Sequence, residues 1–177
     1  MAPASVGNAY EMDLDPRGLI NDKPLDVYLN DHLAGARFGS DLARRLAGRM
    51  DAAAMNAVAE EIEQDRQTLQ QLMDRLGSSR NPVKEAATWV AEKVSHVKLS
   101  GLTAGHREFG LFMALEALSL GIEGKHSLWV ALADVADHYP ELRGFDLVAL
   151  RERAAAQRRV VEAERAAAAP RAFTASA

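Results

Sequence analysis

Acidic and histidine side chains occur in this sequence where an amphipathic helix would otherwise carry apolar residues, and such groups can bind a metal ion. Glu123 and His126 lie three residues apart, so they share one face of a helix. This E-x-x-H spacing supplies ligands to the metal ions of di-iron helical bundles. Asp65 falls between Ile62 and Leu69 in an apolar stripe. A buried, unpaired carboxylate is costly, so Asp65 requires a cation: a metal ion, an Arg, a Lys or a protonated His.

A predicted turn at Arg49 brings further groups of this kind close to Asp65. In an antiparallel hairpin with its turn there, residues whose numbers sum to about 99 lie at one height. His32 then lies about two residues, or roughly 3 Å, from the height of Asp65. Iron, manganese and zinc are the candidate ions. The predicted metal site draws its ligands from three helices, with Asp31 as a further neighbour: His32, Glu61, Asp65, Glu123 and His126.

Basic side chains near the same acids support a second interpretation, a non-enzymatic helical scaffold or interaction protein whose core polar groups form internal ion pairs. Lys125 can neutralise Glu123, and Asp65 can pair with Arg37 or Arg66. A complete di-iron ring takes ligands from all four helices. The last predicted helix brings no carboxylate or His at the right height, so a single-ion site or a bundle without metal is expected. Its inward stripe is Leu147, Leu150, Ala154, Gln157 and Val161.

Glycines suggest a third interpretation, a ligand pocket between two helix pairs. Gly35 and Gly39 lie four residues apart on one side of a helix, and Gly121 and Gly124 leave space beside the acidic cluster. Close packing of neighbouring helices is the alternative explanation of the pair at Gly35 and Gly39.

Apolar residues recur with helical periodicity along most of the chain, and no segment alternates as a strand would. Two short connections predict two antiparallel hairpins, joined by a shorter helix. Glycine, proline and capping residues place the predicted helices at 24–47, 51–76, 82–99, 107–138 and 145–169. The domain organisation is therefore a flexible N-terminal arm at 1–22, a helical bundle at 23–169 and a disordered C-terminal tail at 170–177.

The composition argues against several functional classes. The chain has no Cys, which excludes disulfides, thiolate metal sites and a Cys nucleophile. Its net charge of −4, without a nucleic-acid-binding motif, disfavours nucleic acid as a partner. No stretch approaches the roughly 20 apolar residues that span a bilayer, and no export signal is recognised, so a cytoplasmic protein is expected. No catalytic triad or phosphate loop favours an enzyme. Wide apolar helix faces favour a homo-oligomer, with any other protein partner unknown.

Segments 28–36, 60–65 and 115–125 resemble a group of uncharacterised bacterial proteins that are ferritin-like in architecture. The resemblance covers roughly 25–163. It implies an all-α fold, a ferritin-like antiparallel four-helix bundle of two hairpins with an additional crossover helix. It implies no activity, because the chain does not match the ligand patterns of ferritins, bacterioferritins, rubrerythrins or DNA-protecting mini-ferritins.

Overall fold

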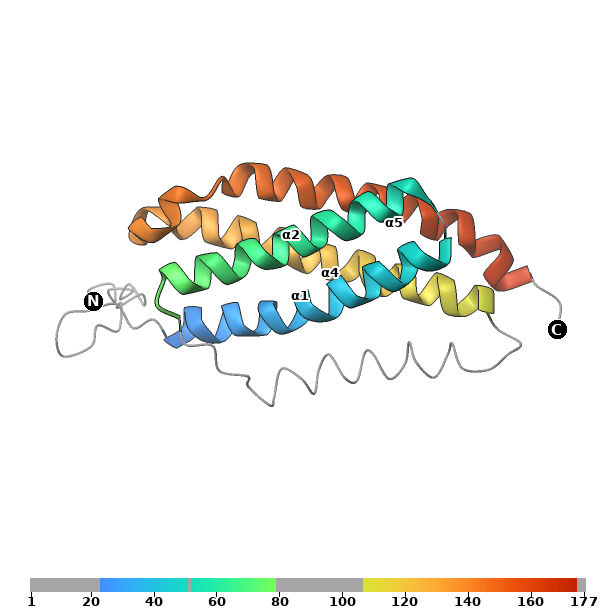
Figure 1. The fold of residues 1–177 in the computed structure, drawn as a ribbon, viewed down its shortest axis with the longest axis horizontal. Coiled ribbons are helices and arrows are strands. Elements are labelled where there is room, and N and C mark those ends of the chain that lie inside the picture. Colours follow the sequence, from blue (N-terminus) through green and yellow to red (C-terminus); the bar gives the residue numbers. More distant parts are fainter. Residues whose placement is uncertain (1–22, 51, 79–106, 175–177) are drawn as a thin grey trace, which may run out of the picture.

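The computed structural model describes residues 23–50, 52–78 and 107–174, and these residues form a helical bundle (Figure 1). The all-α prediction is confirmed, since the described part of the chain contains helices and no strand. None of these helices is long and apolar enough to cross a membrane. The elements are α1 (Lys23–Met50), α2 (Ala53–Arg75), α4 (Arg107–Val135), the short 3-10 helices η1 (Ala136–His138) and η2 (Pro140–Gly144), and α5 (Leu147–Thr174).

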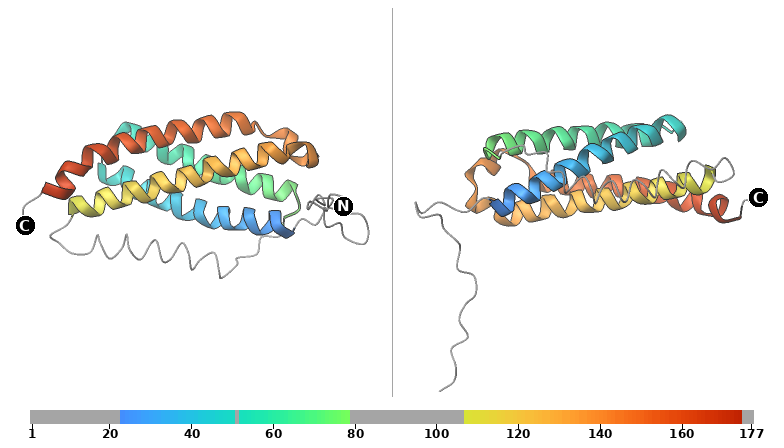
Figure 2. Two further views of the ribbon diagram at one scale, coloured as in Figure 1. Left: turned by 180° about the vertical axis from the view of Figure 1, so that it is seen from behind. Right: turned by 90° about the horizontal axis from the view of Figure 1, so that it is seen from below.

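The four long helices form two antiparallel hairpins that pack on each other. Helix α1 pairs with α2, and α4 pairs with α5; α1 also contacts α4, and α2 contacts α5 (Figures 1 and 2). Helix α2 ends at one end of the bundle, whereas α4 begins at the other (Figure 1). The arm predicted at 1–22 and the helix predicted at 82–99 lie outside the described residues.

The predicted apolar stripes face one another in a single core. On α5, all five residues of the predicted inward stripe are buried, including the polar Gln157, which is 1% exposed. Trp129 of α4 is also 1% exposed. Other core residues that are at most 2% exposed come from all four long helices: Leu29, Leu46, Met55, Leu69, Leu72, Leu115, Leu118, Leu132, Ala154 and Val161.

Each hairpin contains the same polar contact between its two helices. In the first, Ser40 donates a hydrogen bond to Glu63 at 2.6 Å, and Arg66 pairs with that carboxylate at 2.5 Å. In the second, Ser119 donates to Glu162, which also pairs with Arg165, three residues further along α5. A serine on one helix therefore meets a Glu-x-x-Arg pair on the next, and this contact favours one register of the two helices in each hairpin.

Helix α5 continues past the end predicted for it at 169. Pro170 lies inside the helix, which ends at Thr174, so 170–174 do not belong to the predicted disordered tail. Two contacts explain the extension. The ring of Phe173 packs edge-on against that of Phe112 with centroids 5.0 Å apart, and Arg171 Nε donates to Glu108 at 3.0 Å. Tertiary contacts with α4 thus outweigh the loss of one backbone donor at proline.

Candidate functional site

Asp65 of α2 is the centre of a buried polar cluster that joins three helices. Its side chain is 1% exposed. One carboxylate oxygen accepts a hydrogen bond from Lys125 of α4 at 2.5 Å and another from Gln157 of α5 at 3.1 Å. The other oxygen pairs with Arg153 of α5. The prediction that Asp65 needs a cation is therefore met by two basic side chains, each from a different helix.

Gln157 extends this cluster because its amide both donates and accepts. Its nitrogen donates to Glu61 at 3.0 Å as well as to Asp65, and its oxygen accepts from Lys125 at 2.5 Å. The cluster thus contains two acids, Asp65 and Glu61, and two bases, Lys125 and Arg153. Its formal charge is balanced, which is how a helical core can retain ionised groups.

Burial changes the pKa of the Lys125 amine in this cluster. The side chain of Lys125 is 14% exposed, and its desolvation lowers the pKa of the ammonium group below the usual value. The neighbouring Asp65 carboxylate raises that pKa and opposes the effect of burial. Burial and the close carboxylate therefore act on the pKa of the Lys125 amine in opposite directions.

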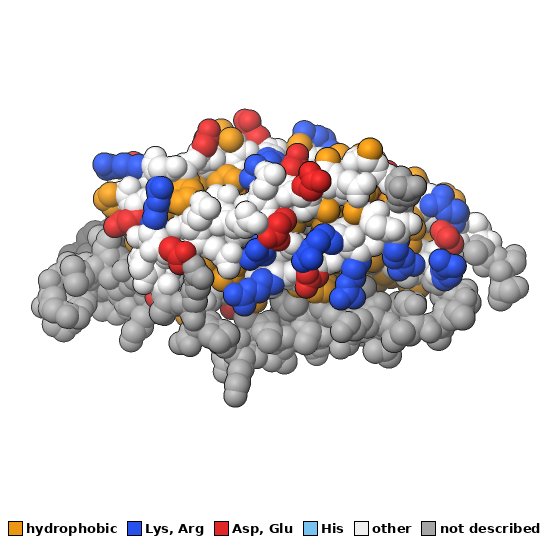
Figure 3. All heavy atoms as spheres, viewed as in Figure 1, with side chains coloured by type: hydrophobic (Ala, Val, Ile, Leu, Met, Phe, Trp, Pro, Cys, Tyr) orange, Lys and Arg blue, Asp and Glu red, His pale blue; other side chains and the backbone are white. Residues whose placement is uncertain are grey.

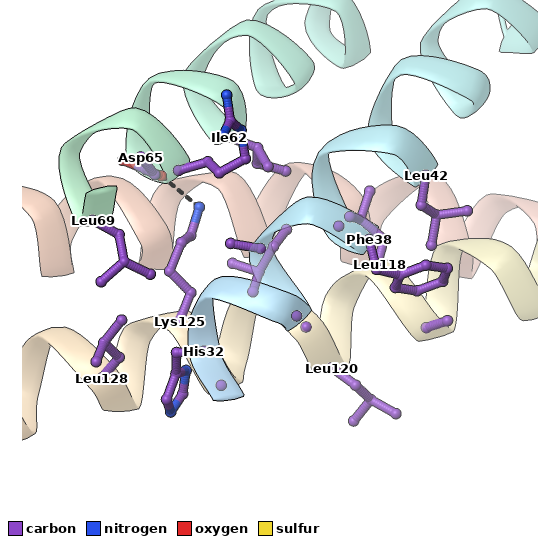
Figure 4. A pocket seen from close by; sticks show the side chains of 18 of the residues that line it. His32, Phe38, Leu42, Ile62, Asp65, Leu69, Leu118, Leu120, Lys125 and Leu128 are labelled. Carbon is purple, nitrogen blue, oxygen red and sulfur yellow. Dashed lines mark hydrogen bonds and ion pairs between the residues drawn. The ribbon is translucent and has the colours of Figure 1, made fainter. Parts of the chain in front are cut away.

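The ion pairs proposed from the sequence differ from those in the structure. Lys125 pairs with Asp65 instead of Glu123, and Glu123 pairs with Arg158 of α5 at 3.0 Å. Arg66 is not a partner of Asp65, because it pairs with Glu63 one turn away on its own helix. Proximity along one helix suggested Glu123 as the partner of Lys125, whereas the side chain of Lys125 extends across the core toward α2 (Figure 4).

The five residues predicted as metal ligands occupy different surroundings. Asp65 and Glu61 both belong to the buried cluster, where they share Gln157 as a hydrogen-bond donor. The side chain of Glu123 is 47% exposed and is paired with Arg158. His126 is partly buried on α4. Among the described residues, no group of three His, Asp or Glu side chains could hold a metal ion. Metal binding stays a prediction.

His32 lies apart from the cluster, on α1. It packs against the ring of Tyr28 with centroids 4.5 Å apart. Burial lowers the pKa of the imidazole, while Asp31 raises it. His32 also lines a pocket whose lining includes Asp65 and Lys125.

Arg153 and Gln157 were not predicted as members of the cluster. Gln157 stood out in the sequence as the one polar residue in the inward stripe of α5, between Ala154 and Val161. This position could have identified Gln157 as a buried polar group. The sequence did not single out Arg153, because an arginine beside the apolar stripe of a surface helix is ordinary. Only the packing of α2 against α5 brings Arg153 to Asp65.

A pocket of about 400 Å³ lies between α1, α2 and α4 (Figure 4). All four glycines singled out in the sequence line it, two on α1 and two on α4. A Cβ atom added at any of them would meet no atom of the described residues within 4 Å, so the missing side chains contribute to the open space. Large apolar side chains complete most of the wall, among them Phe38, Leu42, Ile62, Leu69, Leu118 and Leu128.

Charged and histidine side chains also line this pocket. Lys125 and Asp65 contribute their paired charges, and Arg66, Asp31 and His32 line the pocket as well. On the face shown in Figure 3, acidic and basic side chains of the described residues are interspersed. The arrangement can enclose a mainly apolar molecule and offer it a small number of polar contacts.

Comparison of the chain with protein-family models, with curated proteins and with solved structures gives no match.

Proposed function

We propose that this protein is a non-enzymatic helical bundle that binds an apolar small molecule in the pocket between α1, α2 and α4. The observation that carries the proposal is the coincidence of four glycines with an open space of about 400 Å³. Ligand pockets are commonly between about 300 and 1,000 Å³, apolar, and equipped with a few polar groups. The pocket has each of these properties.

The glycines have an energetic cost that close packing against the described helices does not explain. Glycine inside a helix is less favourable than alanine by roughly 0.5–1 kcal/mol. Among the described residues, no atom lies within 4 Å of the position of a Cβ atom at Gly35, Gly39, Gly121 or Gly124, so none of the described helices approaches these glycines closely. A space kept open for a ligand accounts for all four.

The internal ion pairs belong to the same proposal. Asp65, Lys125 and Arg153 tie α2, α4 and α5 together beside the pocket. These ion pairs oppose collapse of the helices into the pocket, because a shift of the helices would separate the paired polar groups. The cluster is thus a structural support for the pocket rather than a set of catalytic groups.

We further propose ferritin-like connectivity for the bundle. Support comes from the antiparallel pairs α1–α2 and α4–α5, and from the positions where α2 ends and α4 begins, at opposite ends of the bundle. That placement is what a crossover connection requires. Self-association as a homo-oligomer and a cytoplasmic location remain predictions from the sequence.

Binding of a neutral apolar fluorophore tests the proposed function. N-phenyl-1-naphthylamine is expected to bind with about one site per chain and to gain fluorescence in the pocket. Gly39→Leu should weaken this binding, because the new side chain enters the open space.

Gly48→Leu is the matched control. Gly48 lies on the same helix and is not among the residues that line the pocket, and within the described part of the chain a Cβ atom added there would also meet nothing within 4 Å. Equal loss of binding in both variants, or no binding by the unsubstituted protein, would refute the proposal.

A further inference from the structure

Asp31 of α1 brings a negative charge to the pocket for which the described residues supply no partner. It lines the pocket and is exposed, and no hydrogen bond or ion pair joins its carboxylate to another described residue. The residues three and four positions away on the same helix are Val27, Tyr28, Ala34 and Gly35, none of which is basic. Asp31 is therefore a charged group of the pocket that a ligand can reach and that no base one turn away neutralises.

His32 does not supply the missing cation, although it follows Asp31 in the chain and also lines the pocket. Burial lowers the pKa of its imidazole further than Asp31 raises it, so this pKa lies below 6.5. The ring is thus mainly neutral at neutral pH, and it does not balance the charge of Asp31.

The basic groups that line the pocket are already paired within the protein. Lys125 pairs with Asp65 at 2.5 Å, and Arg66 pairs with Glu63 at 2.5 Å. An anionic ligand would have to displace one of these carboxylates from its partner. A cationic ligand finds the carboxylate of Asp31 unmatched by the described residues. The charges of the lining therefore favour a cation.

The mouth of the pocket is the exposed part of its lining, which includes Asp31 and Leu120. Leu120 is 57% exposed, whereas Asp65 and Leu128, which also line the pocket, are each 1% exposed. A cation beside Asp31 keeps part of its hydration, so it avoids the cost of burying a charge among apolar side chains. An apolar body attached to this cation can extend inward to the buried part of the wall.

We infer that the ligand is a mainly apolar molecule with one protonated amine, and that this amine pairs with Asp31 at the mouth of the pocket. The inference rests on the proposed function, because it specifies the chemistry of the molecule bound in the same pocket. The ammonium group stays at the water-exposed edge, and the hydrocarbon part fills the space beside the four glycines of α1 and α4. An amphiphilic amine matches both the apolar wall and the unmatched charge of Asp31.

Three naphthalenes of similar size test this inference by displacement of N-phenyl-1-naphthylamine at neutral pH: the cationic 2-(aminomethyl)naphthalene, the neutral 2-(hydroxymethyl)naphthalene and the anionic 2-naphthoic acid. The amine is expected to bind about threefold more tightly than the alcohol, which is what an exposed ion pair contributes. The acid is expected to bind more weakly than the alcohol. An alcohol that binds as well as the amine, or an acid that binds more tightly than the alcohol, overturns the inference.

Asp31→Asn assigns the pairing, because it removes the charge and keeps a side chain of the same shape. The preference for amine over alcohol should fall to about one in this variant. Asp41→Asn is the matched control: Asp41 lies on the same helix, its side chain is 58% exposed, and it is not among the residues that line the pocket. This control removes the same charge from the protein and should keep the preference of the unsubstituted protein. A preference that Asp31→Asn leaves unchanged, or that both variants lose equally, overturns the role of Asp31.

Salt provides an independent readout in the unsubstituted protein. Added sodium chloride should reduce the preference for amine over alcohol, because dissolved ions screen a charge pair that is exposed to water. A preference that salt does not reduce has another origin than an ion pair, and it overturns the inference.

The failures of the two proposals are distinguishable. If the fluorophore binds and Gly39→Leu weakens it, but the three naphthalenes show no preference for the amine, only the inference about the amine is wrong. If no probe binds, the proposed function fails and the inference fails with it.

Discussion

Asp65 on α2 and Lys125 on α4 form an ion pair of 2.5 Å inside the bundle, although they are 60 residues apart in the sequence. Arg153 from α5 completes the neutralisation of the same carboxylate. The pair connects the two hairpins at the wall of the pocket, and it differs from the pairing of Lys125 with Glu123 that was proposed from the sequence. Several consequences of this arrangement can be measured.

Asp65→Asn should destabilise the protein because it leaves two cations without their acid. Breaking a buried ion pair usually costs about 3–5 kcal/mol. We expect a loss of about 3 kcal/mol in the free energy of unfolding, at the lower end of that range, because the side chain of Arg153 is 31% exposed and can turn toward water. Urea unfolding followed by circular dichroism measures the change.

Asp41→Asn is the control for this experiment. Asp41 pairs with Arg44 on the surface of α1, and the two side chains are 58% and 64% exposed. Loss of such a pair should change stability by less than about 0.5 kcal/mol. If the substitution at Asp65 has as small an effect as the one at Asp41, the buried cluster does not stabilise the bundle.

Stability should fall in acid as Glu63 becomes protonated. Hydrogen bonds from Arg66 first, and from Ser40 second, lower the pKa of Glu63 from 4.5 to about 2. Because the folded-state pKa lies below the unfolded value, the stabilisation is present above pH 4.5 and is lost as the pH falls toward about 2. Unfolding curves measured across this window should become less pH-dependent in Glu63→Gln.

Ser40→Ala should raise the pKa of Glu63 by removing one hydrogen bond to its ionised form. Carbon-detected NMR titration of the Glu63 carboxyl group measures this shift directly. An unchanged pKa in the alanine variant would show that Ser40 does not contribute to holding the carboxylate ionised.

Gly124→Ala should stabilise the protein while narrowing the pocket. The gain expected from helix propensity is about 0.5–1 kcal/mol, since a Cβ atom at this position meets no described residue within 4 Å. Gly77→Ala should have the opposite effect, because Gly77 has a φ of 65° that suits glycine. Thermal unfolding of both variants measures these two opposite changes in stability. A destabilised Gly124→Ala would indicate that the open space beside α4 is not as large as described.

The predicted metal site can be tested by removing one partner of the ion pair between Asp65 and Lys125. A divalent ion at Asp65 has to compete with Lys125 and Arg153 for the carboxylate oxygens. If His32 and Asp65 are ligands, Lys125→Met should therefore raise the affinity of untagged protein for Zn²⁺, as measured by calorimetry. His126→Ala should lower it if the predicted E-x-x-H pair takes part. Zinc binding that neither substitution alters would place any metal elsewhere.

Much of the fold could be predicted because helices are specified locally. Ile62 and Leu69 predicted the buried face of α2, and Leu147, Leu150, Ala154, Gln157 and Val161 predicted that of α5. The same periodicity showed that Asp65 lies on a buried face, and therefore that it requires a cation. The end of α5 was missed because the contacts of Phe173 and Arg171 with α4 extend the helix beyond Pro170.

The sequence by itself determined which segments are helical, where glycines lie along the helices and that a charged group occurs in the core. Each of these features depends on residues within a few helical turns. Only the tertiary structure decided which cations meet Asp65 and where the glycines leave open space. Both depend on the relative rotation and height of helices far apart in the sequence, and shifting one helix by a single residue along its axis exchanges the side chains that face each other. The long side chains of Lys125 and Arg153 add freedom that local spacing does not resolve, because each can reach a partner on its own helix or across the core.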